Sequence, residues 1–169
     1  MNIINYYNIW IIYKKMKDEF KIYLPSLDVT KNFASKLAKI SNKSLFISLR
    51  GKLGSGKTTF SRFFINSLSN KKIKVSSPTF PLVNIYEMSS VTIWHYDLYR
   101  LKKKSEVYAL DFDIALNDIV LVEWPEIIES ILPTNRIDIK FDEDKDSNLF
   151  VEIKILGNEE MKGYFGLNE

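Results

Sequence analysis

The most constraining feature of the sequence is the run GKLGSGKT at residues 51–58, a complete G-x-x-x-x-G-K-[ST] phosphate-binding pattern. An apolar, strand-like run at residues 45–49 precedes it, and a helical pattern at residues 59–65 follows it. The pattern needs this context, because its glycines let backbone N–H groups surround phosphate oxygens at a helix N-terminus. The sequence therefore predicts a nucleoside triphosphate site. The alternative is a glycine-rich turn that binds no ligand.

Two side chains at the end of this run carry specific chemistry. Lys57 would reach the β- and γ-phosphates of the nucleotide, and the hydroxyl of Thr58 would take a place on Mg²⁺. A candidate catalytic lysine and a candidate metal ligand are thus adjacent in the loop.

Hydrolysis also requires carboxylates that handle a metal ion and water. Asp97 ends the apolar run at residues 91–96, and Glu123 ends the run at residues 119–122. Each carboxylate could hold Mg²⁺ directly or through water, or could orient the attacking water. In the alternative interpretation, Asp97 caps a turn and Glu123 pairs with a lysine.

Three side chains near these acids have two interpretations each. Arg100 could steady a phosphate or pair with Asp97. His95, the single histidine of the chain, shares a strand face with Asp97, but a lone histidine in an apolar strand is more often a core residue. Trp94 and Trp124 are most simply anchors in the core or at the surface.

The segment at residues 76–80 reads SSPTF, in which Pro78 stiffens a loop between two hydroxyl side chains. Ser77 and Thr79 could respond to a γ-phosphate, as switch segments do. A plain proline turn is the alternative.

The base is expected to be adenine rather than guanine. Residues 135–138 read NRID, which is similar to the guanine-reading N-K-x-D pattern, but they begin an alternating strand instead of ending a buried one. No D-x-x-G follows the phosphate loop either, since Asp97 leads into a different sequence.

Composition indicates one soluble domain. The 169 residues suffice for a sizeable core, and contents of 46% hydrophobic and 27% charged residues are ordinary for a globular protein. The net charge of +3 comes from scattered lysines, so it allows contact with nucleic acid without arguing for it. The absence of cysteine excludes disulfides and fits a reducing cytoplasm, where we expect the protein to act.

The first 15 residues are apolar and aromatic. They lack the basic start and the cleavage site of a signal peptide, and they are too short and too often interrupted by asparagine to span a bilayer. Met16 begins a second plausible start. We expect residues 1–15 to be a disordered extension or an upstream start, and residues 16–169 to form a single P-loop ATPase domain without membrane contact.

Hydrophobic periodicity predicts strands and helices in alternation. Strands are expected at residues 20–24, 45–49, 73–75, 82–86, 91–96, 119–122, 137–141 and 149–155. Helical segments are expected at residues 29–40 after a cap at Ser26 or Asp28, from the phosphate loop to residue 68, at residues 105–110 and 114–116, and from Pro125. This order predicts a three-layer α/β P-loop NTPase fold, whose mixed central sheet has a parallel core and antiparallel edge strands.

Four segments together resemble one family. They are residues 51–59, residues 77–80 with Leu82, Val83 and Tyr86, residues 95–101 and residues 121–125. In order and spacing they are similar to the TsaE (YjeE) family, bacterial ATPases of tRNA threonylcarbamoyladenosine biosynthesis. The resemblance spans about residues 20–155.

The resemblance implies a small P-loop protein that binds ATP and Mg²⁺ and hydrolyses ATP slowly alone. It implies two partners, TsaD and TsaB, which install the threonylcarbamoyl group on adenosine 37 of tRNAs reading codons that begin with A. Contact with tRNA is expected through this assembly, and direct contact is left open.

The resemblance also assigns residues to roles. The expected nucleotide-binding residues are Gly51, Gly54, Ser55, Gly56, Lys57, Thr58 and Thr59. Thr58 would ligate Mg²⁺, Glu123 would associate with the metal or position water, and Asp97 would fill the second acidic role. The segment Ser77, Pro78 and Thr79 resembles the family's switch, and Trp124 would lie near the nucleotide or a partner, with His95 and Arg100 in support. Leu27 and the loop around Ser147 would border the adenine.

Lys52 departs from the family pattern, which usually has an acid after the first glycine of the loop. Because backbone atoms hold the phosphates, we expect ATP binding to survive. Any charge contact that the acid makes with a partner or a neighbouring loop becomes doubtful.

Two rival functions use the same loop. A small-molecule kinase usually has an arginine-rich lid, whereas the only arginines besides Arg100 are Arg50, Arg62 and Arg136. A non-catalytic, nucleotide-dependent interaction module would bind ATP tightly and would be unaffected by loss of either acid.

Overall fold

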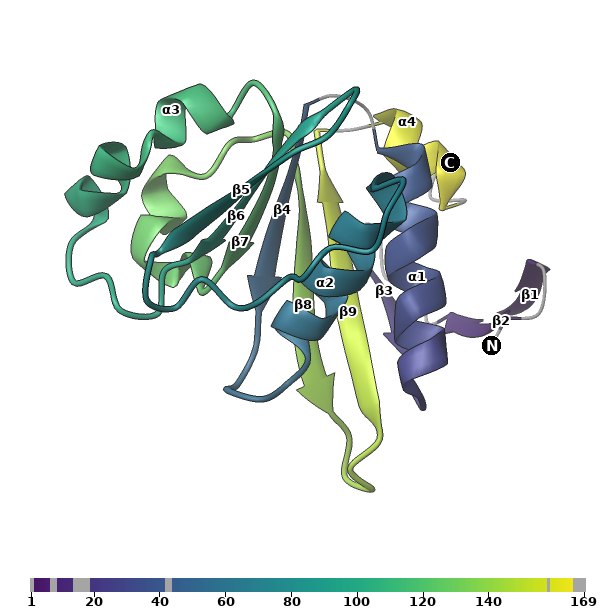
Figure 1. Cartoon of the computed structure of the whole chain (residues 1–169). Coiled ribbons are helices and arrows are strands. Elements are labelled where there is room, and N and C mark those ends of the chain that lie inside the picture. Colours follow the sequence, from purple (N-terminus) through teal and green to yellow (C-terminus); the bar gives the residue numbers. More distant parts are fainter. Residues whose placement is uncertain (1, 7–8, 14–18, 42–43, 158, 166–169) are drawn as a thin grey trace.

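A seven-stranded mixed sheet forms the middle of the computed structural model, which describes residues 2–6, 9–13, 19–41, 44–157 and 159–165. The strand order is β3-β9-β8-β4-β7-β6-β5 (Figure 1). The strands are β3 (Glu19–Tyr23), β4 (Leu45–Arg50), β5 (Val83–Glu87), β6 (Thr92–Asp97), β7 (Ile119–Glu123), β8 (Arg136–Glu143) and β9 (Leu149–Leu156). Strands β8, β4, β7 and β6 run parallel, and the outer pairs are antiparallel, as predicted.

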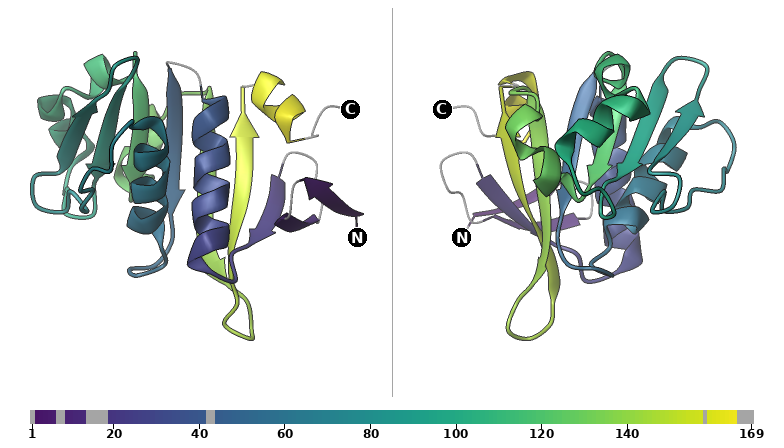
Figure 2. Two further views of the ribbon diagram at one scale, coloured as in Figure 1. Left: turned by 45° about the vertical axis from the view of Figure 1, so that its right-hand side comes forward. Right: turned by 90° about the vertical axis from the view of Figure 1, so that its left-hand side faces the viewer.

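Helices cover both faces of this sheet. The helices α1 (Leu27–Ile40) and α2 (Lys57–Leu68) lie side by side on one face (Figure 1). On the opposite face lie the 3₁₀ helices η1 (Lys104–Leu110) and η2 (Pro125–Ile131) and the short helix α3 (Phe112–Ala115) (Figure 2). The last helix, α4 (Glu159–Tyr164), contributes the buried Met161 to the α1 and α2 side.

The strand pattern divides the core into two layers. Within β4, Ile47 packs under α1 and α2, whereas Phe46 packs under the 3₁₀ helices. Both faces of β4 and β7 are buried, which explains their continuous apolar runs. Alternation along β8 instead leaves Lys140 exposed between the buried Ile139 and Phe141.

Aromatic packing fixes the beginning of α2. Phe60 is fully buried, and its ring centroid lies 5.4 Å from that of Phe33 on α1 and 6.0 Å from that of Phe141 on β8. Burial of such a side chain contributes ~1.5–3 kcal/mol. The first turn of α2 is therefore held against the sheet where the phosphate loop ends.

Ser26 caps α1, since its Oγ accepts a hydrogen bond from the backbone N–H of Val29 at 3.3 Å. Of the two caps expected from the sequence, Ser26 is the one that the structure contains.

The strand predicted at residues 73–75 is wrong. This segment is an irregular connector whose backbone groups bond to side chains of α2. Asn66 accepts from the N–H of Ile73 at 2.9 Å and donates to its carbonyl at 3.2 Å. Arg62 Nε donates to the carbonyl of Val75 at 3.0 Å. These contacts occupy groups that a strand would offer to a neighbouring strand.

A separate antiparallel pair lies near the N-terminus, formed by β1 (Asn2–Tyr6) and β2 (Ile9–Tyr13). Isoleucine, tyrosine and tryptophan favour such extended backbone. The interpretation of residues 1–15 as a disordered extension or an upstream start, and the division at residue 16, stay predictions. Among the described residues, no helix is long and apolar enough to cross a membrane.

Candidate nucleotide site

The phosphate loop joins β4 to α2 and depends on glycine at both ends. Gly51 has a φ of 134°, and a Cβ placed there would lie 2.6 Å from the carbonyl oxygen of Phe141. Gly56, with a φ of 104°, is the left-handed N-cap of α2 and offers no side chain to cap it. The free N–H groups of the first helical turn are thus left for an anion.

A cleft of about 350 Å³ lies beside the loop. Its walls include residues 52–56 of the loop, Leu27 and Thr30 of α1, and Leu149 of β9. Leu27 thus lines the cleft beside the loop, and its contact with the base stays a prediction. Ser147 is not among the lining residues, and Asp142 and Glu143 of the same hairpin line the cleft instead.

Lys57 is buried and folded back over the loop. Its Nζ donates to the carbonyl of Gly51 at 2.7 Å and to that of Lys52 at 2.8 Å. It also lies 4.1 Å from the ring centroid of Trp124. Burial lowers the pKa of the ammonium, and the nearby carboxylates of Glu123 and Asp97 oppose that shift. The ammonium is thus bonded to two carbonyl oxygens of the loop. A phosphate oxygen could replace either of these acceptors.

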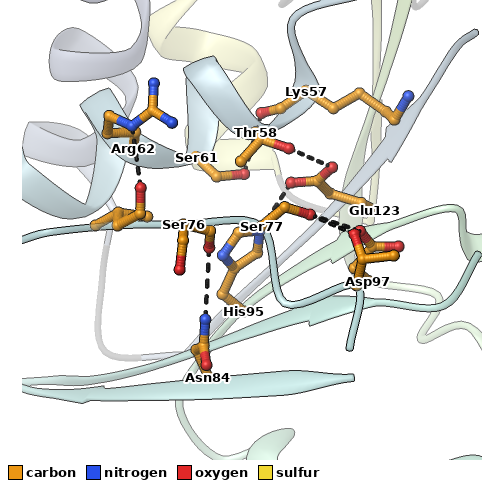
Figure 3. Close-up of polar contacts among 12 residues, drawn as sticks. Lys57, Thr58, Ser61, Arg62, Ser76, Ser77, Asn84, His95, Asp97 and Glu123 are labelled. Atoms are coloured by element: carbon orange, nitrogen blue, oxygen red, sulfur yellow. Dashed lines mark hydrogen bonds and ion pairs between the residues drawn. The ribbon is translucent and has the colours of Figure 1, made fainter. Parts of the chain in front are cut away.

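Glu123 connects β7 to the first turn of α2. Its Oε2 accepts from the hydroxyl of Thr58 at 2.9 Å, and its Oε1 lies 2.8 Å from Nε2 of His95 (Figure 3). Glu123 as a whole is only 2% exposed. The lysine partner considered in the sequence analysis is not its hydrogen-bonding partner, because Thr58 and His95 occupy its two oxygens.

Asp97 stands beside Glu123, in register at the end of the neighbouring parallel strand β6. Its Oδ2 accepts from Ser77 Oγ at 2.7 Å and from Thr79 Oγ1 at 2.6 Å. Its Oδ1 accepts from the N–H of Tyr99 at 3.2 Å, so the carboxylate also caps a turn. The segment with Ser77, Pro78 and Thr79 is thus fastened to one of the two acids.

Arg100 lies beside an aromatic ring rather than beside Asp97, and its expected role of steadying a phosphate stays a prediction. Its guanidinium carbon lies 5.1 Å from the ring centroid of the exposed Phe80. Within the described residues, it forms no ion pair with Asp97, whose oxygens already have partners.

The two candidate tryptophans differ in surroundings. Trp94 is a core residue whose indole N–H donates to Asp118 at 2.9 Å. Trp124 has a φ of 59° at the start of η2, and its ring contacts both Lys57 and Tyr99, with a distance of 4.8 Å between the Trp124 and Tyr99 ring centroids. Only Trp124 thus contacts the loop.

Two contacts of the site had no signal in the sequence. Lys52 Nζ lies 3.6 Å from Oε1 of Glu143, which gives the unusual lysine of the loop an acidic partner on β8. Asn84 donates to the carbonyl of Ser76 at 3.4 Å. Neither pair is detectable from spacing, because it depends on which strands become neighbours.

The donor set fits Mg²⁺. Thr58, Glu123 and Asp97 offer hydroxyl and carboxylate oxygens, which this ion prefers. No group of three or more His, Cys, Asp or Glu side chains that could hold a metal occurs among the residues that the structure describes. Mg²⁺ is commonly bound through one or two carboxylates together with phosphate and water.

Comparison with known proteins decides the family. The sequence model described as "Threonylcarbamoyl adenosine biosynthesis protein TsaE" matches residues 24–150. A protein of Rickettsia conorii named tRNA threonylcarbamoyladenosine biosynthesis protein TsaE is 41% identical over 120 residues, covering 70% of this chain and 69% of the relative. The chain belongs to the TsaE family.

More distant TsaE relatives agree. The protein of the same name from Bacillus subtilis is 33% identical over 129 residues, covering 76% of this chain and 81% of the relative. The crystal structure of B. subtilis YdiB matches with a TM-score of 0.72 at 26% identity, covering 91% of this chain and 97% of that chain. The predicted fold is confirmed, and TsaE membership links the chain to tRNA threonylcarbamoyladenosine biosynthesis.

Proposed function

We propose that this TsaE protein is a Mg²⁺-dependent ATPase that works with TsaD and TsaB to form the threonylcarbamoyl group on adenosine 37 of tRNAs reading codons that begin with A. The observation that carries the proposal is the 2.9 Å bond between Thr58, in the first turn after the loop, and the buried carboxylate of Glu123. It joins the expected metal-binding hydroxyl to an acid that can hold or activate what binds there. We further propose that the protein acts in the cytoplasm.

The loop and Lys57 would bind the phosphates of ATP. Backbone N–H groups at the start of α2 would donate to phosphate oxygens, and the Lys57 ammonium would leave the carbonyls of Gly51 and Lys52 for them. When bound, Mg²⁺ would neutralise charge that develops on the β- and γ-phosphates. Thr58 and Glu123 would hold it, and the cleft beside Leu27 would take the adenine.

Asp97 has a different role in this proposal. Its Oδ2 accepts from both hydroxyls of the Ser77–Thr79 pair, so movement of that segment towards the γ-phosphate would free this oxygen, while Oδ1 would keep its bond to the N–H of Tyr99. Asp97 would then be available to help hold the metal or to orient the attacking water. The two acids therefore have different partners. Glu123 acts with Thr58 at the start of α2, and Asp97 acts with the segment that would respond to the nucleotide.

The test compares two lysines of the same loop. Lys57→Ala should abolish ATP binding and phosphate release, and it should remove threonylcarbamoyladenosine from tRNA in cells. Lys52→Ala is the matched control. It should retain binding, because the Lys52 side chain is exposed and its ammonium lies beside Glu143. We would abandon the proposal if Lys57→Ala left both ATP binding and the modified nucleoside unchanged.

The partner requirement is tested with purified TsaD and TsaB. Phosphate release should be slow for the chain alone and should rise when both partners are added. Transfer of the phosphate to a small molecule instead of water would indicate a kinase. Tight ATP binding with no effect of Glu123→Ala or Asp97→Ala on turnover would indicate a non-catalytic module.

A further inference from the structure

His95 is the only histidine in the chain and is fully buried on β6. Its neighbours along the strand, Trp94 and Tyr96, belong to the core on the opposite face. His95 therefore shares the α2 side of the sheet with Asp97. A buried polar ring in this position requires a hydrogen-bonding partner.

That partner is the carboxylate of Glu123. The distance from His95 Nε2 to Glu123 Oε1 is 2.8 Å, and the other oxygen, Oε2, accepts from Thr58 (Figure 3). An ionised carboxylate can only accept hydrogen bonds, so the ring nitrogen must donate. The proton of the imidazole is therefore on Nε2.

The second ring nitrogen supports the same assignment. Nδ1 is buried and has no hydrogen-bonding partner among the residues that the structure describes. A proton there would be a buried donor without an acceptor, whereas a bare lone pair leaves only an acceptor unpaired, which proteins tolerate more often. A ring that carries a proton on Nε2 and a lone pair on Nδ1 therefore donates to Glu123 and leaves only an acceptor unpaired.

We propose that His95 is the positioning residue for Glu123: its Nε2–H holds Oε1, so that Oε2 is presented to Thr58 and to the cation that binds between them. This inference rests on the proposed function for the role of Glu123. His95 touches neither nucleotide nor metal, and it acts through the carboxylate. Groups that hold a ligand in this way typically change metal affinity or activity about 10- to 100-fold when lost.

The first experiment needs no turnover. Because the chain has one histidine, ¹⁵N labelling of histidine gives a single imidazole in a nitrogen–proton NMR spectrum. The unliganded protein should show a proton on Nε2, and Glu123→Ala should shift the Nε2–H signal and speed its exchange with water. Absence of a proton on Nε2, or a signal that Glu123→Ala leaves in place, would overturn the proposal.

The second experiment uses two amide replacements. In His95→Gln the amide nitrogen reaches the position of Nε2, whereas in His95→Asn it reaches only the position of Nδ1. The Mg²⁺ concentration for half-maximal ATP hydrolysis should rise about tenfold or more in His95→Asn and less than about threefold in His95→Gln. Nucleotide affinity measured without Mg²⁺ and the melting temperature should be similar in the two variants.

Equal effects of the two variants on the Mg²⁺ requirement would reduce His95 to a packing residue and overturn the proposal. Failure of the proposed function has a different signature, since the wild-type chain would then show no Mg²⁺-dependent turnover even with TsaD and TsaB. The NMR measurement on the wild-type chain still decides whether His95 holds Glu123 in that case.

Discussion

The loop at residues 51–56 leads into α2, where Thr58 bonds to Glu123, and the connector at residues 73–82 bonds to the neighbouring acid Asp97, but different interactions hold the two segments in place. The loop is fixed by backbone geometry, with Gly51 pressed against the carbonyl of Phe141 and Gly56 starting α2. The connector is held mainly by side chains of other elements, among them Asn66 and Asp97.

This difference in bonding makes the loop at residues 51–56 rigid and leaves the connector at residues 73–82 able to rearrange. Backbone contacts in the loop cannot change without moving β8 or α2. Each side-chain bond of the connector contributes only about 0.5–1.5 kcal/mol, or about 1.5–3 kcal/mol where the acceptor is charged. A ligand that offers Ser77 or Thr79 another acceptor could therefore release the connector while the loop stays in place.

The largest effect is expected in the loop. Gly51→Ala should lower the free energy of unfolding by about 3 kcal/mol or more, because the new Cβ would meet the carbonyl oxygen of Phe141 at 2.6 Å in addition to backbone strain. Gly54→Ala is the control, since a Cβ there has no neighbour within 4 Å and should cost about 1–2 kcal/mol. Urea unfolding measures both values. If both variants lost the same free energy of unfolding, the close approach of residue 51 to Phe141 would not constrain the loop.

Asp97→Ala should come next, at about 2–4 kcal/mol, because two hydroxyls and one N–H lose a charged acceptor. The decisive measurement is hydrogen exchange resolved by residue. Exchange should accelerate in residues 76–82 and stay slow in α2. Uniform acceleration across both regions would contradict the division into a rigid loop and a separable connector.

Asn66→Ala should cost about 1–2 kcal/mol through loss of its two bonds to Ile73. Asn32→Ala, on the exposed side of α1, provides the control and should change thermal stability little. In calorimetry, Asn66→Ala should thus melt lower than Asn32→Ala. Coincident transitions would show that the connector does not depend on α2 for its position.

The smallest effect concerns Lys52. Lys52→Glu restores the acid usual in the family but places it near Glu143, so it should cost less than about 1 kcal/mol at low salt and almost nothing at high salt. Lys52→Ala separates loss of the pair from new repulsion. A large loss in Lys52→Glu that persists at high salt would mean that this position contributes to the loop by packing.

The sequence predicted most of the fold because its signals are local. The phosphate loop, the apolar run of β7 and the alternation along β8 and β9 each define an element without knowledge of the rest. The strand at residues 73–75 was predicted wrongly because Arg62 and Asn66, on a helix, take its backbone groups. Propensity cannot anticipate that competition.

The site was predicted as a set of residues rather than as contacts. The motifs predicted Thr58, Asp97 and Glu123 as site residues. Strand order and register, however, determine which hydroxyl bonds to which acid. His95 was expected to be a core residue or a supporting one, and it is buried and bonded to Glu123. The pairing of Lys52 with Glu143 depends on the β8–β9 hairpin lying beside the loop, which no spacing rule contains.

The parallel arrangement of α1 and α2 has an electrostatic consequence. Leu27 and Thr30, at the start of α1, line the same cleft as the start of α2, so the positive ends of two helix dipoles lie near it. Asp28 offsets the field of α1 within its first turn, whereas the first turn of α2 contains no acid. The attraction for polyanions is thereby concentrated at one helix end. We expect it to persist when surface lysines are neutralised, although the whole chain carries a net charge of only +3.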